Sequence, residues 1–188
     1  MRLIAGLGNP GKEYRKSRHN LGFRAVELLA RKHHARYFWP RYLGRVSRIS
    51  IGEEEVLLLK PHTYMNMSGK SVSQALRKLN LYPDQLIVIH DDLDLKLGQL
   101  KVGFSLKSAG HKGLESIIQE TGSKDFFRIR LGIGRPQDQD DVVAYVLQAF
   151  AREEEAQVEK MLDSACEAVE VLVKYGLEKA QNLFNARK

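Results

Sequence analysis

Short, unbroken apolar runs alternate with helical stripes along this chain of 188 residues. Val56–Leu59 and Leu86–Ile89 are continuous apolar segments, which is typical of strands buried on both faces of a sheet. Between them, Ser68–Asn80 carries apolar residues at the i, i+3, i+4, i+7 spacing of a helix: Val72, Ala75, Leu76 and Leu79. This alternation predicts an α/β fold in which helices flank a mixed, largely parallel twisted sheet.

The rest of the chain continues the pattern. Further elements are expected as strands over Arg2–Leu7 and Phe127–Ile133, and as helices over Leu21–His33, around Leu114 to Ile118, over about Glu153–Tyr175 and over Leu177–Asn185. Gly176 lies between the last two helices, where glycine commonly ends a helix. Because no repeat, low-complexity tract or linker interrupts the pattern, residues 1–188 are expected to form a single domain.

The composition excludes several classes of protein. Apolar residues make up 43% of the chain and charged residues 28%, as in globular proteins. No apolar run approaches the roughly 20 residues that a membrane span requires, and the first strand-like run reaches a turn too early for a signal peptide. The single cysteine, Cys166, excludes an internal disulfide and fits a reducing compartment. These features predict a cytoplasmic protein with no membrane partner.

Positive charge is concentrated near the N-terminus. The net charge is +7, yet residues 1–50 alone hold twelve Lys or Arg against Glu13 and Glu27, a local excess of ten. Charge gathered in this way can form a patch that attracts a polyanion such as nucleic acid, or it can form a solvated basic face. Charge alone leaves both interpretations open.

The first motif, GLGNPG at residues 6–11, follows a strand and fits the G-x-G-x-x-G pattern of dinucleotide-binding loops. In those loops a helix opens at the third glycine, and an acidic residue follows about 20 positions later at the end of the second strand. Here the helical stripe begins only near Leu21, and Glu27 lies inside it. We therefore interpret the glycines as permitting a tight, positive-φ loop that presents Asn9 at the carboxyl end of a strand.

Two further segments place a histidine and a carboxylate near strand or helix ends. His19 directly precedes the helix that begins near Leu21, and Asp91 follows the buried run that ends at Ile89. Carboxylates at the carboxyl end of such a strand lie where α/β folds place their sites. A lone histidine is nevertheless more often structural than catalytic, and the neighbouring acids Asp92 and Asp94 can equally belong to a solvated turn.

A third polar segment, residues 60–69, again lies between a buried strand and a helix. Pro61 stops the strand, and Ser68 can cap the helix. Tyr64 offers an aromatic face for stacking, and Asn66 offers an amide that both donates and accepts hydrogen bonds. Three polar loops, each after a strand, are expected to converge on one crevice.

These segments, taken in order, resemble the bacterial-type peptidyl-tRNA hydrolase family. The resemblance rests on GLGNPG, Tyr14, RHN at residues 18–20, KP-x-TYMN-x-SG, HDDLDL-x-LG, GH-x-GL, FRIRLGIGRP and the YVL that ends at Leu147. It covers the chain from its first residues to about Leu147, and the helical tail fits the same family. Several separated motifs in one order are far more specific than any one of them.

The resemblance implies an enzyme that cleaves the ester between a peptide and the terminal ribose of tRNA, releasing tRNA from stalled or aborted translation. It implies His19 as the general base that activates water and Asp91 as the acid that orients it. Asn9 corresponds to the asparagine associated with telling N-blocked peptidyl groups from free aminoacyl groups. The positions that match contacts to tRNA or substrate are Tyr14, Tyr64 and Asn66. No metal or organic cofactor is implied, and we expect a monomer.

The implied chemistry suits the residues. An ester needs only a positioned water and a base near neutral pKa, and a histidine base contributes roughly 10²–10⁴-fold. The Asn66 amide is our candidate for steadying the developing oxyanion. Because no G-x-S-x-G elbow occurs and Cys166 lies within a predicted helix, no covalent acyl-enzyme is expected.

One position departs from the family pattern. The usual Gly-His-Asn-Gly reads here as Gly110-His111-Lys112-Gly113. Lysine cannot accept a hydrogen bond, whereas asparagine both accepts and donates. A contact of Lys112 to the peptide or to a bridging water is then lost, or it is replaced by a contact to phosphate.

The predicted RNA contacts are the basic residues nearest His19, namely Lys12, Arg15, Lys16 and Arg18. If these residues do not bind RNA, the patch must come from the segment between Arg24 and Arg48, or from the opposite rim: Lys101, Lys107 and Lys112.

Two other functions fit part of the sequence. A catalytically silent RNA-binding module on the same fold suits the basic N-terminal third, but the presence of both His19 and Asp91 counts against it. A metal-dependent hydrolase would use the acids and histidines gathered near residue 91: His90, Asp91, Asp92, Asp94, His19 and His111. No H-E-x-x-H or C-x-x-C spacing supports such a site.

Overall fold

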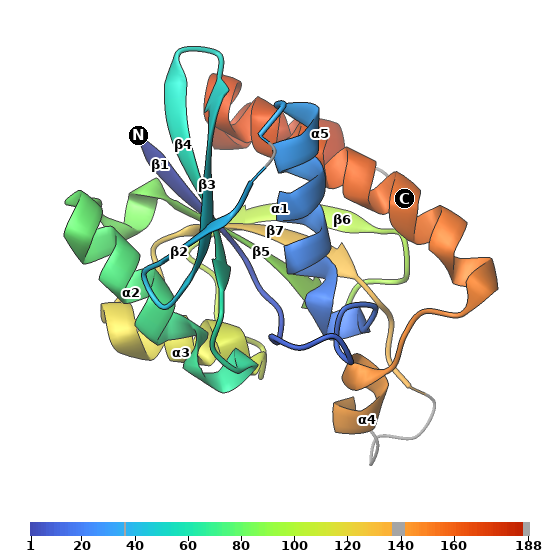
Figure 1. The fold of residues 1–188 in the computed structure, drawn as a ribbon. Helices are drawn as coiled ribbons and strands as arrows, with labels where there is room; N and C mark the ends of the chain where they lie inside the picture. Colours follow the sequence, from blue (N-terminus) through green and yellow to red (C-terminus); the bar gives the residue numbers. More distant parts are fainter. Residues whose placement is uncertain (36, 137–141, 186–188) are drawn as a thin grey trace.

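One mixed sheet organises the computed structural model, which describes residues 1–35, 37–136 and 142–185 (Figure 1). Within these residues, seven strands lie in the order β2-β3-β4-β1-β5-β7-β6. Their bounds are β1 Arg2–Gly6, β2 Trp39–Arg41, β3 Gly44–Ile51, β4 Glu54–Pro61, β5 Leu86–Asp92, β6 Leu100–Phe104 and β7 Phe127–Gly132. The helices are α1 Leu21–Lys32, α2 Ser68–Leu79, α3 Lys112–Thr121, α4 Val142–Leu147 and α5 Arg152–Phe184, with single 3-10 turns at Arg18–Asn20, Met65–Met67 and Pro83–Gln85.

The parallel part of the sheet is its centre. Strands β4, β1, β5 and β7 run parallel to one another. The pairings outside them are antiparallel: β3 with β4, β2 with β3, and β6 with β7. The predicted mixed sheet flanked by helices is confirmed, and its parallel portion is the four central strands. The sequence patterns did not reveal β2, β3 and β6, because none of these outer strands has a long apolar run. In β3, for example, the exposed Arg45 and Arg48 interrupt the apolar residues.

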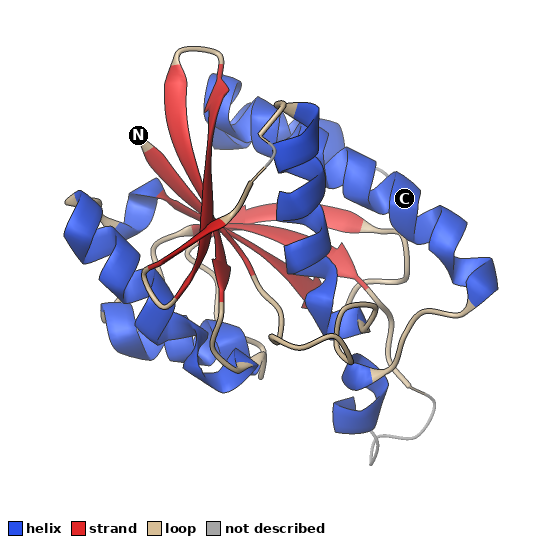
Figure 2. Ribbon diagram, viewed as in Figure 1, coloured by secondary structure: helices blue, strands red, loops and turns tan. Residues whose placement is uncertain are grey.

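Helices cover both faces of the sheet (Figure 2). Helices α1 and α5 pack on one face, where they bury Ile4 of β1. Helices α2 and α3 pack on the other, where they bury Leu3 and Ala5. A central strand therefore needs apolar side chains in both directions, which explains its unbroken apolar sequence. Each fully buried aliphatic side chain of this kind contributes roughly 1.5–3 kcal/mol.

Helix α1 approaches β1 too closely for side chains at the contact. A Cβ on Gly6 would lie 2.1 Å from the carbonyl oxygen of Gly22, and a Cβ on Gly8 would meet an aromatic ring at 2.7 Å. In the GLGNPG motif only Gly11, with a φ of 122°, has a left-handed backbone. The interpretation of these glycines as residues of a positive-φ loop is therefore wrong for Gly6 and Gly8, which permit close packing instead.

The bounds of α1, α2, α3 and α5 lie close to the predicted ones, whereas α4 was not predicted. Gly176 interrupts α5 with non-helical φ and ψ of 81° and −179°, as expected. Ser68 is the first residue of α2 rather than its cap, and no side-chain hydrogen bond caps this helix. Strand β5 continues beyond Ile89 to Asp92, so Asp91 lies within the strand and not after it. None of the helices in the described part of the chain combines the length and hydrophobicity of a membrane span.

Candidate active site

The carboxyl ends of β4, β1 and β5 meet at one edge of the sheet, where they surround a cavity of about 510 Å³. Asn9 lies in the loop after β1, Tyr64 and Asn66 follow β4, and Asp91 is near the end of β5. Open α/β sheets bind ligands at this edge, because the loops there leave a crevice between adjacent strands. His19, from the turn before α1, completes this polar part of the cavity.

A buried carboxylate links two imidazoles in this cavity. His19 Nδ1 lies 2.8 Å from Asp91 Oδ1 and 2.9 Å from Oδ2, and His111 Nε2 lies 3.1 Å from Oδ1. The side chain of Asp91 is 2% exposed, compared with 12% for His19 and 9% for His111. Since an ionised carboxylate only accepts hydrogen bonds, both imidazoles donate to it.

The hydrogen bonds of His111 determine its tautomer. His111 is the N-cap of α3, and its Nδ1 accepts hydrogen bonds from the backbone N–H groups of Gly113 and Leu114 at 3.2 and 3.4 Å. Its proton is therefore on Nε2, which faces Asp91. The other imidazole differs: the Nδ1 proton of His19 points to Asp91, so its Nε2 is free to accept a proton.

Charges around Asp91 set the protonation states. Burial by itself raises the pKa of Asp91, but its electrostatic interactions and hydrogen bonds with His19 and His111 outweigh burial and hold that pKa far below its usual range. Burial lowers the pKa of His19, but the charge and hydrogen bond of Asp91 more than offset it, so that pKa lies above 6.5. Burial, together with the electrostatic effect of the nearby His111, holds the pKa of the adjacent His90 well below its usual value, so His90 is neutral.

In the described ranges, one group of three side chains could together hold a metal ion: His19, Asp91 and His111. One ligand atom each from His19, Asp91 and His111 lies within 4.8 Å of the others. Two imidazoles and a carboxylate form a donor set that zinc accepts. In the present geometry the same nitrogen atoms already donate hydrogen bonds to the carboxylate.

Comparison with known proteins identifies the family. The family model for peptidyl-tRNA hydrolase matches residues 3–188. A peptidyl-tRNA hydrolase of Dehalococcoides mccartyi is 42% identical over 99% of this chain and 100% of its own length. The crystal structure of peptidyl-tRNA hydrolase from Acinetobacter baumannii has a TM-score of 0.94 and 35% identity, covering 100% of this chain and 96% of that one. The chain belongs to the peptidyl-tRNA hydrolase family.

The family's asparagine, Asn9, is held in place by two neighbouring loops. Its backbone N–H donates to Asn20 Oδ1 at 2.8 Å, and Asn20 Nδ2 donates to its carbonyl oxygen at 3.0 Å. The side-chain Oδ1 of Asn9 accepts a hydrogen bond from the backbone N–H of Met65 at 2.8 Å. Because the oxygen is engaged, the group that Asn9 offers to the cavity is its Nδ2 donor.

Part of the cavity lining is apolar. Helix α4 contributes to it through Val142, Val143, Val146 and Leu147. The remaining acids near the cavity are paired: Arg130 Nε donates to Asp92 Oδ2 at 2.7 Å, and Arg135 binds Asp94. Asp92 is buried and paired, so its interpretation as part of a solvated turn is wrong, whereas Asp94 is exposed.

The other family positions lie differently around the site. Tyr64 and Asn66 line the cavity and are exposed, and Lys112 lies at its rim with its side chain 68% exposed. The Nζ of Lys112 donates to Glu115 at 3.1 Å. Tyr14 is not among the residues that line the cavity.

Two residues of the site were missed as functional groups by sequence reasoning. His111 was considered only as a metal ligand, and Asn20 only as part of the RHN motif. The GH-x-GL motif contained a signal for His111, because a histidine directly before a helical stripe can cap the helix. For Asn20 no local signal exists, since its partner Asn9 lies 11 residues away.

Proposed function

We propose that this chain hydrolyses the ester between the peptide and the terminal ribose of peptidyl-tRNA, using water activated by His19. Membership of the family supports the reaction. The observation that carries the mechanism is the contact of 2.8 Å between His19 Nδ1 and Asp91, which leaves Nε2 as a proton acceptor in a cavity.

The proposed reaction has two steps. His19 Nε2 takes a proton from water as the oxygen attacks the ester carbonyl carbon, and the imidazolium is stabilised by Asp91. When the tetrahedral intermediate collapses, the bond between that carbon and the ribose oxygen breaks, and the imidazolium returns its proton to this oxygen. The products are the free peptide acid and tRNA. Such a base contributes roughly 10²–10⁴-fold to the rate.

Two amides assist this reaction in the proposal. Asn66 lines the cavity and has a donor that can stabilise the oxyanion of the intermediate. The Nδ2 donor of Asn9 can bind the carbonyl oxygen of the first peptide bond. A free aminoacyl group has an ammonium there instead, which cannot accept a hydrogen bond. This difference supports the assignment of Asn9 to substrate discrimination.

No protein nucleophile enters the proposal. Burial raises the pKa of the Cys166 thiol to about 12, and this side chain is enclosed between α5 and α1. A thiol of that kind is inert.

We further propose that the reaction takes place in the cytoplasm, where peptidyl-tRNA is made. In this proposal the enzyme acts as a monomer and contacts tRNA through Tyr14 and Tyr64.

A second candidate, metal-dependent hydrolysis, is favoured only by the cluster of His19, Asp91 and His111. A direct test separates the two mechanisms. We expect the purified chain to release N-acetyl-amino acid from tRNA in excess EDTA as fast as without it, and to spare free aminoacyl-tRNA. A separate measurement of tRNA folding in EDTA controls for the loss of magnesium. Loss of turnover in EDTA that zinc restores would favour the metallohydrolase, and tRNA binding with no turnover would favour the silent RNA-binding module.

A further inference from the structure

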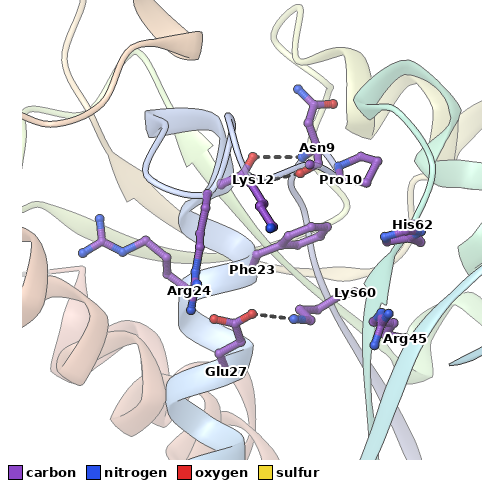
Figure 3. A pocket seen from close by; sticks show the side chains of 12 residues that line it. Asn9, Pro10, Lys12, Phe23, Arg24, Glu27, Arg45, Lys60 and His62 are labelled. Carbon is purple, nitrogen blue, oxygen red and sulfur yellow. Dashed lines mark hydrogen bonds and ion pairs between the residues drawn. The ribbon is translucent and has the colours of Figure 1, made fainter. Parts of the chain in front are cut away.

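A second cavity, of about 450 Å³, lies on the other side of the Asn9 loop. Asn9 lines both cavities, so the two are separated by little more than this loop. Figure 3 shows that Lys12 enters the second cavity from the loop, whereas Arg45 of β3, Lys60 of β4 and His62, which directly follows β4, enter from the opposite side. Phe23 lies between these two sides. We call this cavity the basic cleft.

The lining of the basic cleft is strongly cationic. Five side chains of Lys or Arg face one carboxylate, that of Glu27: Lys12, Arg15, Arg24, Arg45 and Lys60. Low-dielectric walls lined by one sign of charge concentrate the field, so such a cleft attracts anions.

Three other Lys or Arg side chains among the first 50 residues form ion pairs. Arg18 binds Glu154 and Lys32 binds Asp163, both acids of α5, and Arg48 binds Glu55. In the basic cleft, Lys12, Arg15 and Arg45 are exposed and form no ion pair with any described residue. Three unpaired cations are therefore gathered beside the Asn9 loop.

Two further cations of the cleft are held in position. Lys60 binds Glu27 and lies over the rings of Phe23 and Phe38, with its Nζ 5.6 and 4.6 Å from their centroids. Arg24 donates through Nη2 to Glu155, which leaves its buried Nη1 without a hydrogen-bond partner among the described residues. A fixed cation with a free donor is the arrangement expected around a bound oxyanion.

We propose that the basic cleft binds phosphodiester groups of the RNA strand that adjoins the ester, an inference that rests on the proposed function. The ester joins two unlike arms, a peptide of variable charge and an RNA chain with one negative charge per nucleotide. The cavity around His19 has an apolar wall and only paired charges, whereas the basic cleft has unpaired cations. Charge complementarity assigns the RNA strand to the cleft, and the shared Asn9 places the cleft within reach of the nucleotides nearest the ester.

A pair of matched double variants tests this assignment. Lys12→Gln with Arg45→Gln removes two charges from the cleft, and Arg77→Gln with Lys78→Gln removes two exposed charges from α2, away from both cavities. Loss of two phosphate contacts to a single strand should make the log–log dependence of tRNA affinity on salt shallower by about 1.4. It should also raise KM for N-acetyl-aminoacyl-tRNA about tenfold, with a much smaller effect on kcat. The control should match the wild type.

Shorter substrates locate the contact. An N-acetyl-aminoacyl ester of adenosine has no phosphate, so the cleft variant and the wild type should cleave it equally well. An ester on the 3′-terminal trinucleotide restores the nearest phosphates and should restore the difference between them. An unchanged salt slope, an equal defect on the adenosine ester, or a defect that follows the acidity of the peptide would overturn the proposal. Failure of the wild type to cleave any ester would instead refute the proposed function, and the salt slope of tRNA binding would still test the cleft.

Discussion

The two cavities that share Asn9 differ in whether their charged side chains are paired. Around His19, Asp91 is held by two imidazoles, Asp92 is paired with Arg130, and these groups are largely buried. In the basic cleft the cations of Lys12, Arg15 and Arg45 face solvent without ion-pair partners in the part of the chain described.

The difference matches two physical tasks. A group that transfers a proton must keep one position and one tautomer, so its partners fix it before substrate arrives. A group that attracts a flexible polyanion gains from staying hydrated and uncompensated until counterions are released. Substitutions in the first cavity should therefore change kcat, and substitutions in the basic cleft should change KM and its salt dependence.

The largest expected effect is that of His19→Ala. Removing the proposed base should lower kcat on N-acetyl-aminoacyl-tRNA by roughly 10²–10⁴-fold. The dissociation constant of tRNA should change little, because the backbone contacts of the basic cleft remain. Single-turnover kinetics and a filter-binding titration measure the two quantities. A kcat within a few-fold of the wild type would end the assignment of His19 as the base.

A smaller loss is expected from Asp91→Asn, which keeps the shape of the carboxylate but removes its charge. We expect kcat to fall by about 10–10²-fold, because the imidazolium loses its stabilising partner. The pH profile gives an independent readout. The charge of Asp91 raises the pKa of His19, and activity requires neutral His19, so wild-type kcat/KM should rise with pH through a value above 6.5. Without that charge, burial dominates, and the midpoint should move to lower pH. A midpoint that stays fixed or moves upward would contradict this account of the pair.

Arg18→Gln tests whether Arg18, beside His19, stabilises the fold through an ion pair and does not bind RNA. Arg18 was predicted as an RNA contact, but its side chain is buried and binds Glu154 through both terminal nitrogens. Its Cζ lies 4.5 Å from the ring centroids of both Tyr145 and Phe150. The substitution should lower the free energy of unfolding by about 1–3 kcal/mol, since it leaves Glu154 without its charged partner. Urea denaturation measures this loss. The salt slope of tRNA binding should remain that of the wild type, and a shallower slope would return Arg18 to the RNA-binding surface.

Arg18 also illustrates what the sequence could predict. The buried central strands were recognisable because each one is apolar in both directions. The contact between His19 and Asp91 was predictable because each residue lies in a motif near an element boundary. Arg18 and Asn20 could not be interpreted locally, because their roles depend on partners elsewhere in the fold; Glu154 lies 136 residues from Arg18. Strands β2 and β3 were missed for a related reason: β3 forms by pairing with β4, and β2 forms by pairing with β3.

The smallest effect is expected from Lys112→Asn, which restores the residue usual in the family. Lys112 lies at the rim of the active-site cavity, yet its Nζ is engaged by Glu115 and its side chain is 68% exposed. An exposed ion pair of this kind contributes only about 0–1 kcal/mol, so the fold should tolerate its loss. Because the ammonium points to Glu115 and not to Asp91 or His19, we expect kcat to change less than about threefold.

If asparagine restores a hydrogen bond to the peptide, the gain should appear as a lower KM for long peptidyl groups and be absent for a single N-acetyl-amino acid. Steady-state kinetics with both substrates separate these effects. A tenfold change in kcat would place Lys112 among the groups that touch the reacting ester, and a shallower salt slope would place it on the RNA backbone with the cations of the basic cleft.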